Sequence, residues 1–562
     1  MTQKNLSIGL PILLVLATGI WGIRWGLPSA ERTALFLRPE LQTDGFYRKV
    51  EAFRSQYYES FGFNPFAAGG RIARTGKDYQ QSASILSSYS SFLLRVHTSD
   101  EQGTLVMISH LKPWKGEWYP YTFAYGGGYI YPLAAYLAVL AVTGRVHLIS
   151  QASYYYRYPN EIAKIYLSLR TWSIIGVIPG TIALFLLGCR LGSRRIGLWS
   201  SSLFALAPIC VASAKLAKPH TWAGSWVLCA FYLGLLAKEE DRFKPLLFSA
   251  ICFGMAVGTI LSQLAFLPLL IWTCWTPDIQ KSLRQSAAYL GTAGTVALAA
   301  NFYVFAHAQD YLDEAALGRR WYPFRISFNA LWEFAHVHFV SLGPFLAPLV
   351  LVGLIAALFQ RKDCRLTTLA IISLLIFGFV AFEVQSQKGP PAPTRFCIAL
   401  IGIFCFFAAW FTENIRGGRW LRWVCLVGLL SEAALYDLHF RSDRAPFDNA
   451  SEAGLWIRDH VPRGGVIGQT QMIPHIHDFP PIDFYRYRIV PFSSPEFREA
   501  KPPVFAVTAG FIAPGGDMAR ARDMLLQNHF ALVRRFADSP LQKLGFTDSI
   551  VDANFVVEIY QK

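Results

Sequence analysis

The sequence predicts an α-helical protein that crosses a membrane many times and carries a small α/β domain in its C-terminal part. Apolar residues make up 53% of the 562 positions and charged residues only 16%, which leaves too little polar surface for a soluble protein of this length. Uncharged windows recur along the chain, most of them near the ~20 residues that a membrane-spanning helix needs. Beyond about Arg441, short strand patterns replace these windows.

Charged residues bound the uncharged windows and so mark the expected spans. Eight windows each predict one crossing, at residues 5–23, 171–189, 196–214, 219–237, 285–309, 334–360, 366–382 and 396–412. The window 245–277 would measure about 50 Å as one helix, so we expect two short spans there that meet near Ser262 and Gln263. A weaker window at 420–438, which contains Arg422 and Glu432, brings the predicted count to about eleven.

The distribution of Lys and Arg predicts the orientation, because short cytoplasmic loops collect these residues. With two crossings between 245 and 277, Lys4 and the basic clusters after each pair of spans fall on one side. We therefore expect a plasma (inner) membrane protein with a cytoplasmic N-terminus and an external C-terminal domain. Residues 128–148 are apolar, but a span there would move the cluster at 190–195 outside. They are predicted to form juxtamembrane helices within one external loop, residues 28–166.

The C-terminal part has the pattern of a small α/β domain. An amphipathic stretch around Ala453 to Ile457 ends at the Pro462–Gly465 segment. Apolar runs predict buried strands, and residues 518–528 predict a helix between them; the expected strands are 466–468, 504–507, 531–533 and 555–559. We therefore divide the chain into a transmembrane domain, 1–440, and an external α/β domain, 441–562.

Charge, cysteine and histidine content argue against several functions. The formal net charge is +15, but the basic residues form no single long patch, so no nucleic-acid partner is expected. The nine cysteines fall in expected spans or cytoplasmic loops and form no C-x-x-C motif. Four histidines of the outer segments match no compact metal motif: His97, His220, His336 and His338. No obligatory cofactor is predicted, and the sequence gives no support for a divalent metal.

An acidic pair, Asp100 and Glu101, lies in the polar segment that follows the first expected span. It is followed in order by Pro113, Trp114, Pro120, Phe123, Tyr125, Tyr129, Tyr131 and Tyr136. This order, an acidic pair, a proline, F-x-Y and further aromatic residues, resembles the GT-C superfamily of glycosyltransferases. The resemblance is to its family-39-like members, which include ArnT-like and protein-mannosyltransferase-like enzymes. The A-x-x-W-I and P-x-G patterns of the C-terminal part resemble the same proteins.

The resemblance implies a GT-C fold and a membrane glycosyltransferase, a hexosyl or pentosyl transferase. Its donor would be a sugar on a polyprenyl phosphate, and its acceptor an external lipid, glycan or protein, with inversion at the sugar. It places the catalytic base at Asp100, with Glu101 beside it. From the residues alone, both acids can instead stabilise the N-terminus of a helix that Thr98 or Ser99 caps.

The segment from Lys215 to Thr221 is expected between the third and fourth spans, where the family usually has another acid. Pro219 or His220 stands at the position of that acid. The departure suggests His220 as a replacement proton acceptor, because imidazole titrates near neutral pH. Lys215 and Lys218 are candidate phosphate ligands. The alternative is a pair of interfacial lysines that extend to water, followed by a helix-starting proline.

Three arginines and a tyrosine complete the predicted substrate-binding set. Arg319 and Arg320 lie in an outer loop, and guanidinium groups match phosphate oxygens, although a solvated charged loop explains them equally well. Arg395 precedes a late span, as an R-F or R-Y pair does in the family, and a proline-rich hairpin gives the same pattern. Tyr125 belongs to the F-x-Y motif.

Two family lysines are absent from this chain. Ser262 and Gln263 are the polar residues of the segment 260–264, where the family often has a lysine, and Gly126–Gly128 replace its F-x-K-P lysine. Two other functions therefore stay open, a carrier or flippase of lipid-linked sugars and a catalytically inactive scaffold. Against a carrier, charges avoid the span centres apart from Glu432, whereas transporters place ionisable residues there.

Overall fold

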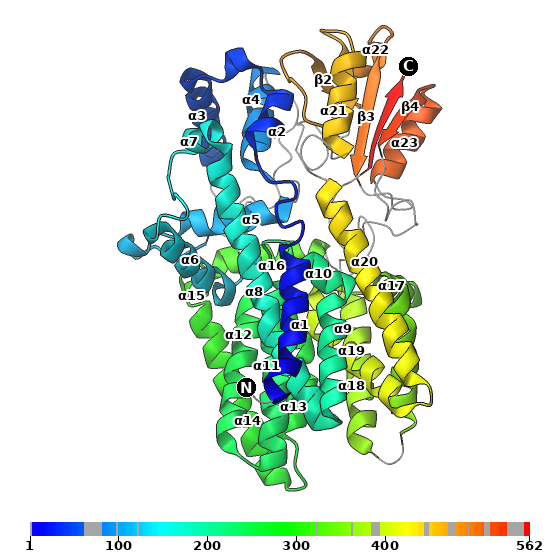
Figure 1. Cartoon of the computed structure of the whole chain (residues 1–562). Helices are drawn as coiled ribbons and strands as arrows, with labels where there is room; N and C mark the ends of the chain where they lie inside the picture. Colours follow the sequence, from blue (N-terminus) through cyan, green and yellow to red (C-terminus); the bar gives the residue numbers. More distant parts are fainter. Residues whose placement is uncertain are drawn as a thin grey trace.

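The computed structural model shows a helical unit below an extramembrane unit that contains a five-stranded sheet (Figure 1). It describes residues 3–60, 81–96, 99–120, 123–321, 324–360, 363–383, 394–442, 449–469, 479–492, 494–510, 517–536 and 556–562. The C-terminal sheet lies at the top of Figure 1, beside helices of the first external loop. The predicted fold class, a polytopic helical protein with external helices and a C-terminal α/β part, is confirmed.

The helical unit contains a helix for each predicted window. Its helices are α1 (Gln3–Ile20), α8 (Pro159–Leu191), α9 (Arg194–Leu206), α10 (Pro208–Ala214), α11 (His220–Glu240), α12 (Phe243–Thr259), α13 (Leu267–Cys274), α14 (Ile279–Ala300), α17 (Phe328–Leu358), α18 (Cys364–Glu383), α19 (Ile398–Asn414) and α20 (Gly418–Ser442). Two short 3-10 helices, η3 (Leu261–Phe266) and η4 (Thr394–Cys397), lie between them.

Three of these helices refine the predicted windows. The break predicted in 245–277 is present, and it falls at Ile260, which is extended between α12 and η3. The window 285–309 was too long, because α14 already ends at Ala300. Helix α17 is kinked at Gly343, whose φ of 80° only glycine adopts readily. Breaks of this kind interrupt apolar runs without changing their composition, so window counting does not detect them.

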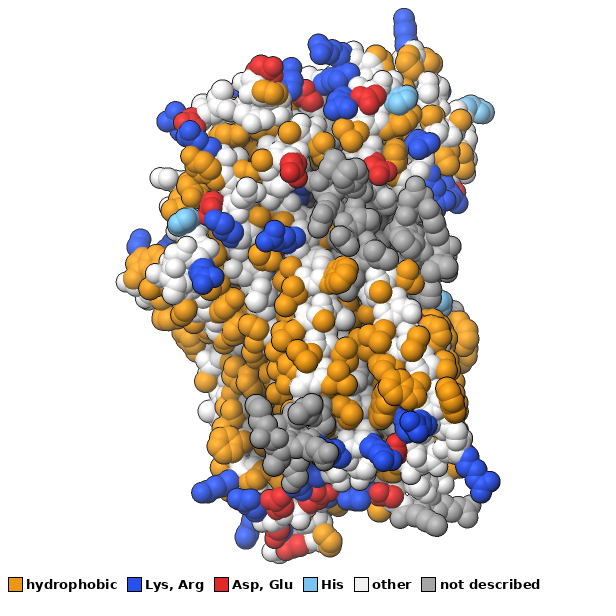
Figure 2. Space-filling view, viewed as in Figure 1, with side chains coloured by type: hydrophobic (Ala, Val, Ile, Leu, Met, Phe, Trp, Pro, Cys, Tyr) orange, Lys and Arg blue, Asp and Glu red, His pale blue; other side chains and the backbone are white. Residues whose placement is uncertain are grey.

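Among the described residues, length and composition allow four helices to cross a membrane individually, within Pro159–Leu191, Ser341–Leu358, Cys364–Glu383 and Arg395–Asn414. The pair α9 and α10, bent by 59°, makes a fifth candidate. The predicted total of about eleven stays a prediction. Figure 2 shows apolar side chains over the middle of the helical unit, with Lys, Arg, Asp and Glu gathered at the ends of the molecule.

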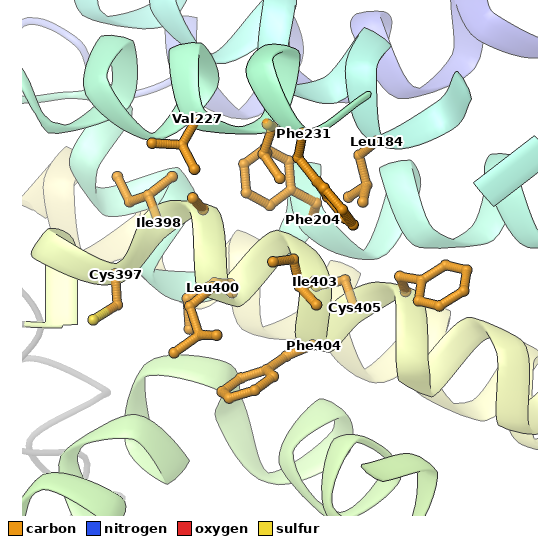
Figure 3. Packing of buried hydrophobic residues seen from close by; sticks show 14 of the residues in the cluster. Leu184, Phe204, Val227, Phe231, Cys397, Ile398, Leu400, Ile403, Phe404 and Cys405 are labelled. Atoms are coloured by element: carbon orange, nitrogen blue, oxygen red, sulfur yellow. The ribbon is translucent and has the colours of Figure 1, made fainter. Parts of the chain in front are cut away.

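Helix α19 forms the centre of the helical core. It is apolar on all sides, as expected for a helix enclosed by others. Figure 3 shows its side chains among those of α8, α9 and α11; the labelled residues are Leu184, Phe204, Val227, Phe231, Cys397, Ile398, Leu400, Ile403, Phe404 and Cys405. Gly224 lets α11 approach closely, since a Cβ there would lie 2.8 Å from the Cβ of Ile398.

The external part of the first half of the chain is helical. It contains α2 (Ala30–Phe36), η1 (Pro39–Leu41), α3 (Asp44–Ser60), α4 (Gln81–Leu94), α5 (Ser99–His110), η2 (Pro113–Lys115), α6 (Gly127–Val142) and α7 (Ala152–Arg157). The later elements α15 (Tyr303–Ala306) and α16 (Ala308–Trp321) lie beside them. Helices α6 and α7 match the predicted juxtamembrane segments, and their position at a membrane surface stays a prediction.

The C-terminal part contains the predicted strands and two elements that the sequence analysis missed. The sheet order is β2-β1-β3-β5-β4, with β1 parallel to β2 and β3, and β5 antiparallel to β3 and β4. Its elements are α21 (Asn449–His460), β1 (Val466–Gln469), β2 (Arg488–Pro491), α22 (Pro495–Glu499), β3 (Phe505–Gly510), α23 (Asp517–Gln527), β4 (Ala531–Phe536) and β5 (Val556–Gln561). Strand β2 and helix α22 were missed because both are very short.

One hydrophobic core connects the first external loop to the C-terminal part. The ring of Tyr89 in α4 meets the ring of Phe484 edge-on, with 5.2 Å between centroids. The Tyr89 hydroxyl donates to Asp483 Oδ1 at 3.2 Å, and Asp483 also pairs with Arg38 at 2.8 Å. Burial, together with the Asp483 charge, raises the pKa of Tyr89, so the phenol keeps its proton and donates. The division of the chain at residue 440 stays a prediction.

A glycine turn joins the first external loop to the helical unit. The Gly126 N–H donates to Thr259 O at 2.9 Å, and the Gly127 N–H donates to Asn301 Oδ1 at 2.9 Å. A Cβ at Gly126 would lie 2.0 Å from the Gly258 carbonyl oxygen, and a Cβ at Gly127 would lie 2.0 Å from Ala300 O. The turn therefore has no room for a side chain, which explains why no lysine stands in this segment.

We predict that Gly126→Ala lowers the free energy of unfolding by about 1–3 kcal/mol, because the new methyl group meets backbone that cannot move aside. Gly291→Ala on α14 is the matched control, since nothing lies within 4 Å of a Cβ there. The control should leave stability unchanged or raise it by up to about 1 kcal/mol. Thermal unfolding in detergent measures both, and an equal response of the two variants would contradict the packing argument.

Candidate active site

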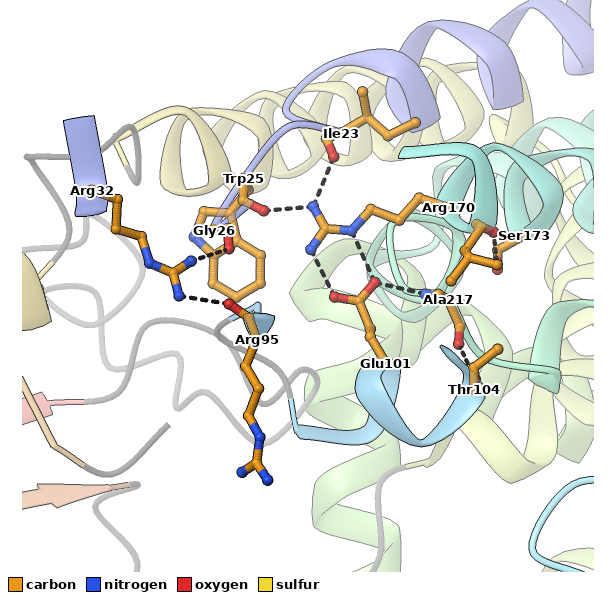
Figure 4. Close-up of polar contacts among 11 residues, drawn as sticks. Ile23, Trp25, Gly26, Arg32, Arg95, Glu101, Thr104, Arg170, Ser173 and Ala217 are labelled. Atoms are coloured by element: carbon orange, nitrogen blue, oxygen red, sulfur yellow. Dashed lines mark hydrogen bonds and ion pairs between the residues drawn. The ribbon is translucent and has the colours of Figure 1, made fainter. Parts of the chain in front are cut away.

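A buried ion pair holds the start of α5 against the helical unit (Figure 4). Arg170 of α8 donates from Nε to Glu101 Oε1 at 2.9 Å and from Nη2 to Oε2 at 2.7 Å, and both side chains are 0% exposed. The Nη1 atom of Arg170 donates to the carbonyl oxygens of Ile23 and Trp25 at 2.7 and 2.5 Å. One guanidinium therefore joins the turn that follows α1, helix α5 and helix α8.

The Glu101 carboxylate also fixes the connection between α10 and α11. The Ala217 N–H donates to Glu101 Oε1 at 2.8 Å, and the Thr104 hydroxyl donates to Ala217 O at 2.8 Å. With three donors on its two oxygens and no exposure, this carboxylate cannot reach an acceptor hydroxyl. The structure therefore corrects the expected catalytic role of Glu101 to a structural one. Charge-assisted bidentate pairs of this kind are geometrically specific.

Asp100 directly precedes Glu101 in α5. The side chain of Asp100 lies outside the described residues, as do His97 and Thr98. Its predicted roles, catalytic base or helix cap, stay predictions.

Three basic side chains of the α10–α11 connection are buried. Lys215, Lys218 and His220 are 1%, 2% and 3% exposed. The Ser173 hydroxyl donates to Lys218 O at 3.4 Å, which adds to the contacts of Ala217 in fixing this segment. The alternative of lysines extending into water is wrong, because these ammonium groups are enclosed. Burying an ammonium is costly unless negative groups or acceptors surround it.

Aromatic contacts gather Tyr125, His220 and Arg395 into one cluster. The ring centroids of Tyr125 and His220 lie 6.3 Å apart, and those of His220 and Phe396 lie 4.8 Å apart. The Arg395 guanidinium carbon lies 5.9 Å from the centre of the Phe396 ring. The first external loop, the start of α11 and η4 therefore converge, although 95 positions separate Tyr125 from His220 and 175 separate His220 from Arg395.

The other predicted arginines stand on a separate external helix. Arg319 is exposed on α16, and the side chain of Arg320 lies outside the described residues. Helix α16 is held by Tyr119, whose hydroxyl donates to Asp310 Oδ2 at 3.2 Å, and by the Phe123 N–H, which donates to Glu314 Oε2 at 2.9 Å. Within the described part of the chain, Arg319 makes no hydrogen bond, ion pair or ring contact with the Tyr125–His220–Arg395 cluster, so its role as a phosphate ligand stays a prediction.

Within the described ranges, no group of three or more His, Cys, Asp or Glu side chains could hold a metal ion. His338 is buried against the Phe334 ring at 4.2 Å, and His336 is exposed.

Two residues that organise this region were not singled out from the sequence. The sequence analysis used Arg170 only to mark the boundary of an apolar window. A lone arginine beside a span is, however, a recognisable sign of a buried pair or a functional site. Asn301 was placed inside a span, whereas its amide accepts from Gly127 N–H and donates to Gly258 O at 3.1 Å. Neither partner can be inferred from sequence spacing.

A family model described as dolichyl-phosphate-mannose-protein mannosyltransferase matches residues 162–305. The matched segment contains Arg170 and the α10–α11 connection with its buried cations. The predicted resemblance to the GT-C glycosyltransferases is confirmed. The match covers about a quarter of this GT-C-like chain, and none of the curated proteins has a matching sequence.

Solved structures of two GT-C proteins are similar to the chain. ArnT from Cupriavidus metallidurans bound to undecaprenyl phosphate is 14% identical, with a TM-score of 0.45, over 87% of this chain and 98% of that chain. Its apo state is 12% identical, with a TM-score of 0.41, over 84% and 95%. The oligosaccharyltransferase AglB from Archaeoglobus fulgidus, in complex with an inhibitory peptide and a dolichol-phosphate, is 13% identical, with a TM-score of 0.36, over 69% and 58%.

We predict that Glu101→Gln lowers the free energy of unfolding by about 3–5 kcal/mol, because it leaves the Arg170 charge buried without its partner. Glu117→Gln is the control, since the Lys112–Glu117 pair is exposed and such pairs contribute about 0–1 kcal/mol. Thermal unfolding of both variants in detergent measures the difference. Equal stability of the two variants would show that the pair is not an anchor.

We predict that acid lowers the stability of the fold through His110, which lies at the end of α5. Burial, with smaller contributions from Lys112 and Arg54, lowers its pKa to about 4, against an ordinary value of about 6.5. Between these values the unfolded chain binds a proton that the folded chain does not, so stability is lost as the pH falls from about 6.5 to about 4. In His110→Gln, the free energy of unfolding should fall by on the order of 1–3 kcal/mol less over this pH range than in the wild type. Thermal unfolding measured at pH 7 and pH 4.5 tests it, and an unchanged pH dependence would contradict it.

Proposed function

We propose that this chain transfers a sugar from a polyprenyl-phosphate donor to an external lipid, glycan or protein acceptor, with inversion at the sugar. The matched family description names such a donor, dolichyl-phosphate-mannose, and a protein acceptor. The observation that carries the proposal is the contact from Glu101 to the Ala217 N–H. Through it, the helix that bears Asp100 and the segment that bears Lys215 and Lys218 are held together.

The proposed reaction is a single displacement at the anomeric carbon. The Asp100 carboxylate takes the proton of the acceptor hydroxyl, and the hydroxyl oxygen attacks the anomeric carbon. The bond from that carbon to the phosphate oxygen breaks, and its electron pair stays on the phosphate. Lys215, Lys218 and Arg395 stabilise the departing anion. Attack opposite to the leaving group inverts the anomeric configuration.

His220 is the second candidate for the proton acceptor. It stands where the family places another acid, and its ring lies between Tyr125 and Phe396. Arg319 and Arg320 on α16 are proposed to contact the donor phosphate once the donor is bound. No metal ion is required for this chemistry, because the cations of the protein supply the positive charge.

The proposed location is the plasma (inner) membrane, with the N-terminus cytoplasmic and residues 441–562 external. Basic side chains at the far end of the helical unit support this orientation (Figure 2). Among them, Arg190 binds Glu239 and Glu240, and Arg365 binds Glu239.

We predict that Asp100→Asn lowers sugar transfer at least about 100-fold, because the base is removed while the donor site is retained. Cells that lack the protein should accumulate the lipid-linked sugar donor, which mass spectrometry of membrane lipids identifies. Wild type and Glu117→Gln should clear the accumulated lipid, whereas Asp100→Asn should not. His220→Gln in the same assay separates the two candidate bases. Full clearance by Asp100→Asn would remove Asp100 from the mechanism and favour the scaffold.

A carrier of lipid-linked sugars is the second candidate function. The observation that favours it is Glu432 of α20, which is 6% exposed and lies against the kink of α17. A Cβ at Gly343 would lie 2.1 Å from Glu432 Oε2. Buried acids beside broken helices are typical of transporters. In vesicles without acceptor, a carrier would move the lipid across the bilayer, and a transferase would leave it in place.

A further inference from the structure

Beside the basic residues, a closed circuit of contacts links segments that lie far apart in the sequence. Thr259 O accepts from Gly126 N–H at 2.9 Å, and the adjacent Tyr125 ring meets His220. His220 meets Phe396, whose carbonyl oxygen accepts from Gln263 Nε2 at 3.2 Å. The Gln263 N–H donates to Ile260 O at 3.2 Å, and Ile260 follows Thr259. Four segments of the chain thus form one ring of contacts.

Three neutral polar atoms, two on this circuit and one on the residue that follows His220, have no hydrogen-bond partner within the described part of the chain. They are the side-chain oxygens of Gln263, Thr259 and Thr221. These residues are 1%, 0% and 1% exposed. Buried polar atoms are nearly always hydrogen-bonded, and leaving one unpaired costs about 1–3 kcal/mol. Three such atoms on or next to one ring of contacts favour a hydrogen-bonding ligand at this place.

The chemistry of these atoms differs from that of the basic segment. Gln263 already uses Nε2 on the Phe396 carbonyl, so its free oxygen acts as an acceptor. The threonine hydroxyls both donate and accept. None of the three carries a charge, and the nearby Glu101 carboxylate is used by Arg170 and Ala217.

We propose that Gln263, Thr259 and Thr221 form the subsite for the sugar ring of the donor, and that this subsite selects neutral hydroxylated sugars. The inference rests on the proposed function and adds the substrate class. Sugar hydroxyls donate to the Gln263 oxygen and exchange hydrogen bonds with the two threonines. An amino sugar would bring an ammonium group to a buried place without a counter-charge, which is costly. A uronic acid would place its carboxylate against the Gln263 oxygen.

The test compares lipids with and without a sugar. Purified protein in detergent is titrated with undecaprenyl phosphate, with the same lipid carrying glucose, and with the same lipid carrying an amino pentose. Gln263→Leu and Thr259→Val should each weaken binding of the glucosyl lipid about 5- to 100-fold. Both should leave binding of the sugar-free lipid within about 2-fold. Wild type should bind the glucosyl lipid more tightly than the amino-pentose lipid.

Two further variants make the result specific. Thr295→Val on α14 is the control, since this exposed hydroxyl binds its own helix at Gly291 O, and it should change neither affinity. Lys218→Met should weaken the sugar-free and glucosyl lipids equally, because it acts on the phosphate. Thermal unfolding confirms that each variant is folded, and Thr259→Val, which keeps the side-chain shape, tests the inference if Gln263→Leu does not fold.

Each contrary outcome is distinguishable. Equal weakening of both lipids by Gln263→Leu and Thr259→Val, or no weakening at all, would overturn the sugar subsite. A wild-type preference for the amino-pentose lipid would overturn the proposed sugar class. If wild type binds none of the three lipids, the proposed function itself is wrong.

Discussion

The Arg170–Glu101 pair is the constraint on which the candidate site depends. A charged pair with no exposure is stable only when its hydrogen-bonding positions are used, and here the remaining positions are used by the carbonyls of Ile23 and Trp25 and by the Ala217 N–H. The same geometry that satisfies the two charges therefore sets the position of α5 and of the segment with Lys215 and Lys218. A second arginine, Arg32, strengthens the region by donating to Gly26 O at 2.8 Å and Arg95 O at 2.6 Å (Figure 4).

Around the Arg170–Glu101 pair, the basic side chains and the neutral polar side chains occupy separate places. Lysines and Arg395 gather where a phosphate is proposed to lie, and Gln263, Thr259 and Thr221 stand where a sugar is proposed to lie. The glycine turn at Gly126–Gly128 brings the first loop against α12 and α14 and leaves no room for a lysine. The absence of the F-x-K-P lysine is thus a packing feature of this chain as well as a difference in its chemistry. The core shared by Tyr89 and Phe484 connects the first loop to the sheet domain.

Some of the site could be predicted from the sequence, because a motif order marks functional segments even when their contacts are unknown. Tyr125, His220 and Arg395 were predicted separately and are brought together by aromatic contacts. Glu101 was predicted in a catalytic role, because an acidic pair looks the same whether it binds a substrate or an internal arginine. Arg319 was grouped with the other basic residues on charge alone, and the structure places it on an exposed external helix.

The sequence by itself determined the fold class, the approximate positions of the apolar helices and most strands, because hydropathy and side-chain periodicity are local properties of the chain. It also determined the break between α12 and α13, since one helix of that length would exceed the bilayer. The tertiary structure decided which polar groups meet. Arg170 and Glu101 are 69 positions apart, and Gln263 and Phe396 are 133 apart. Such pairs depend on how helices pack in three dimensions, and no local pattern records the partner of a buried charge.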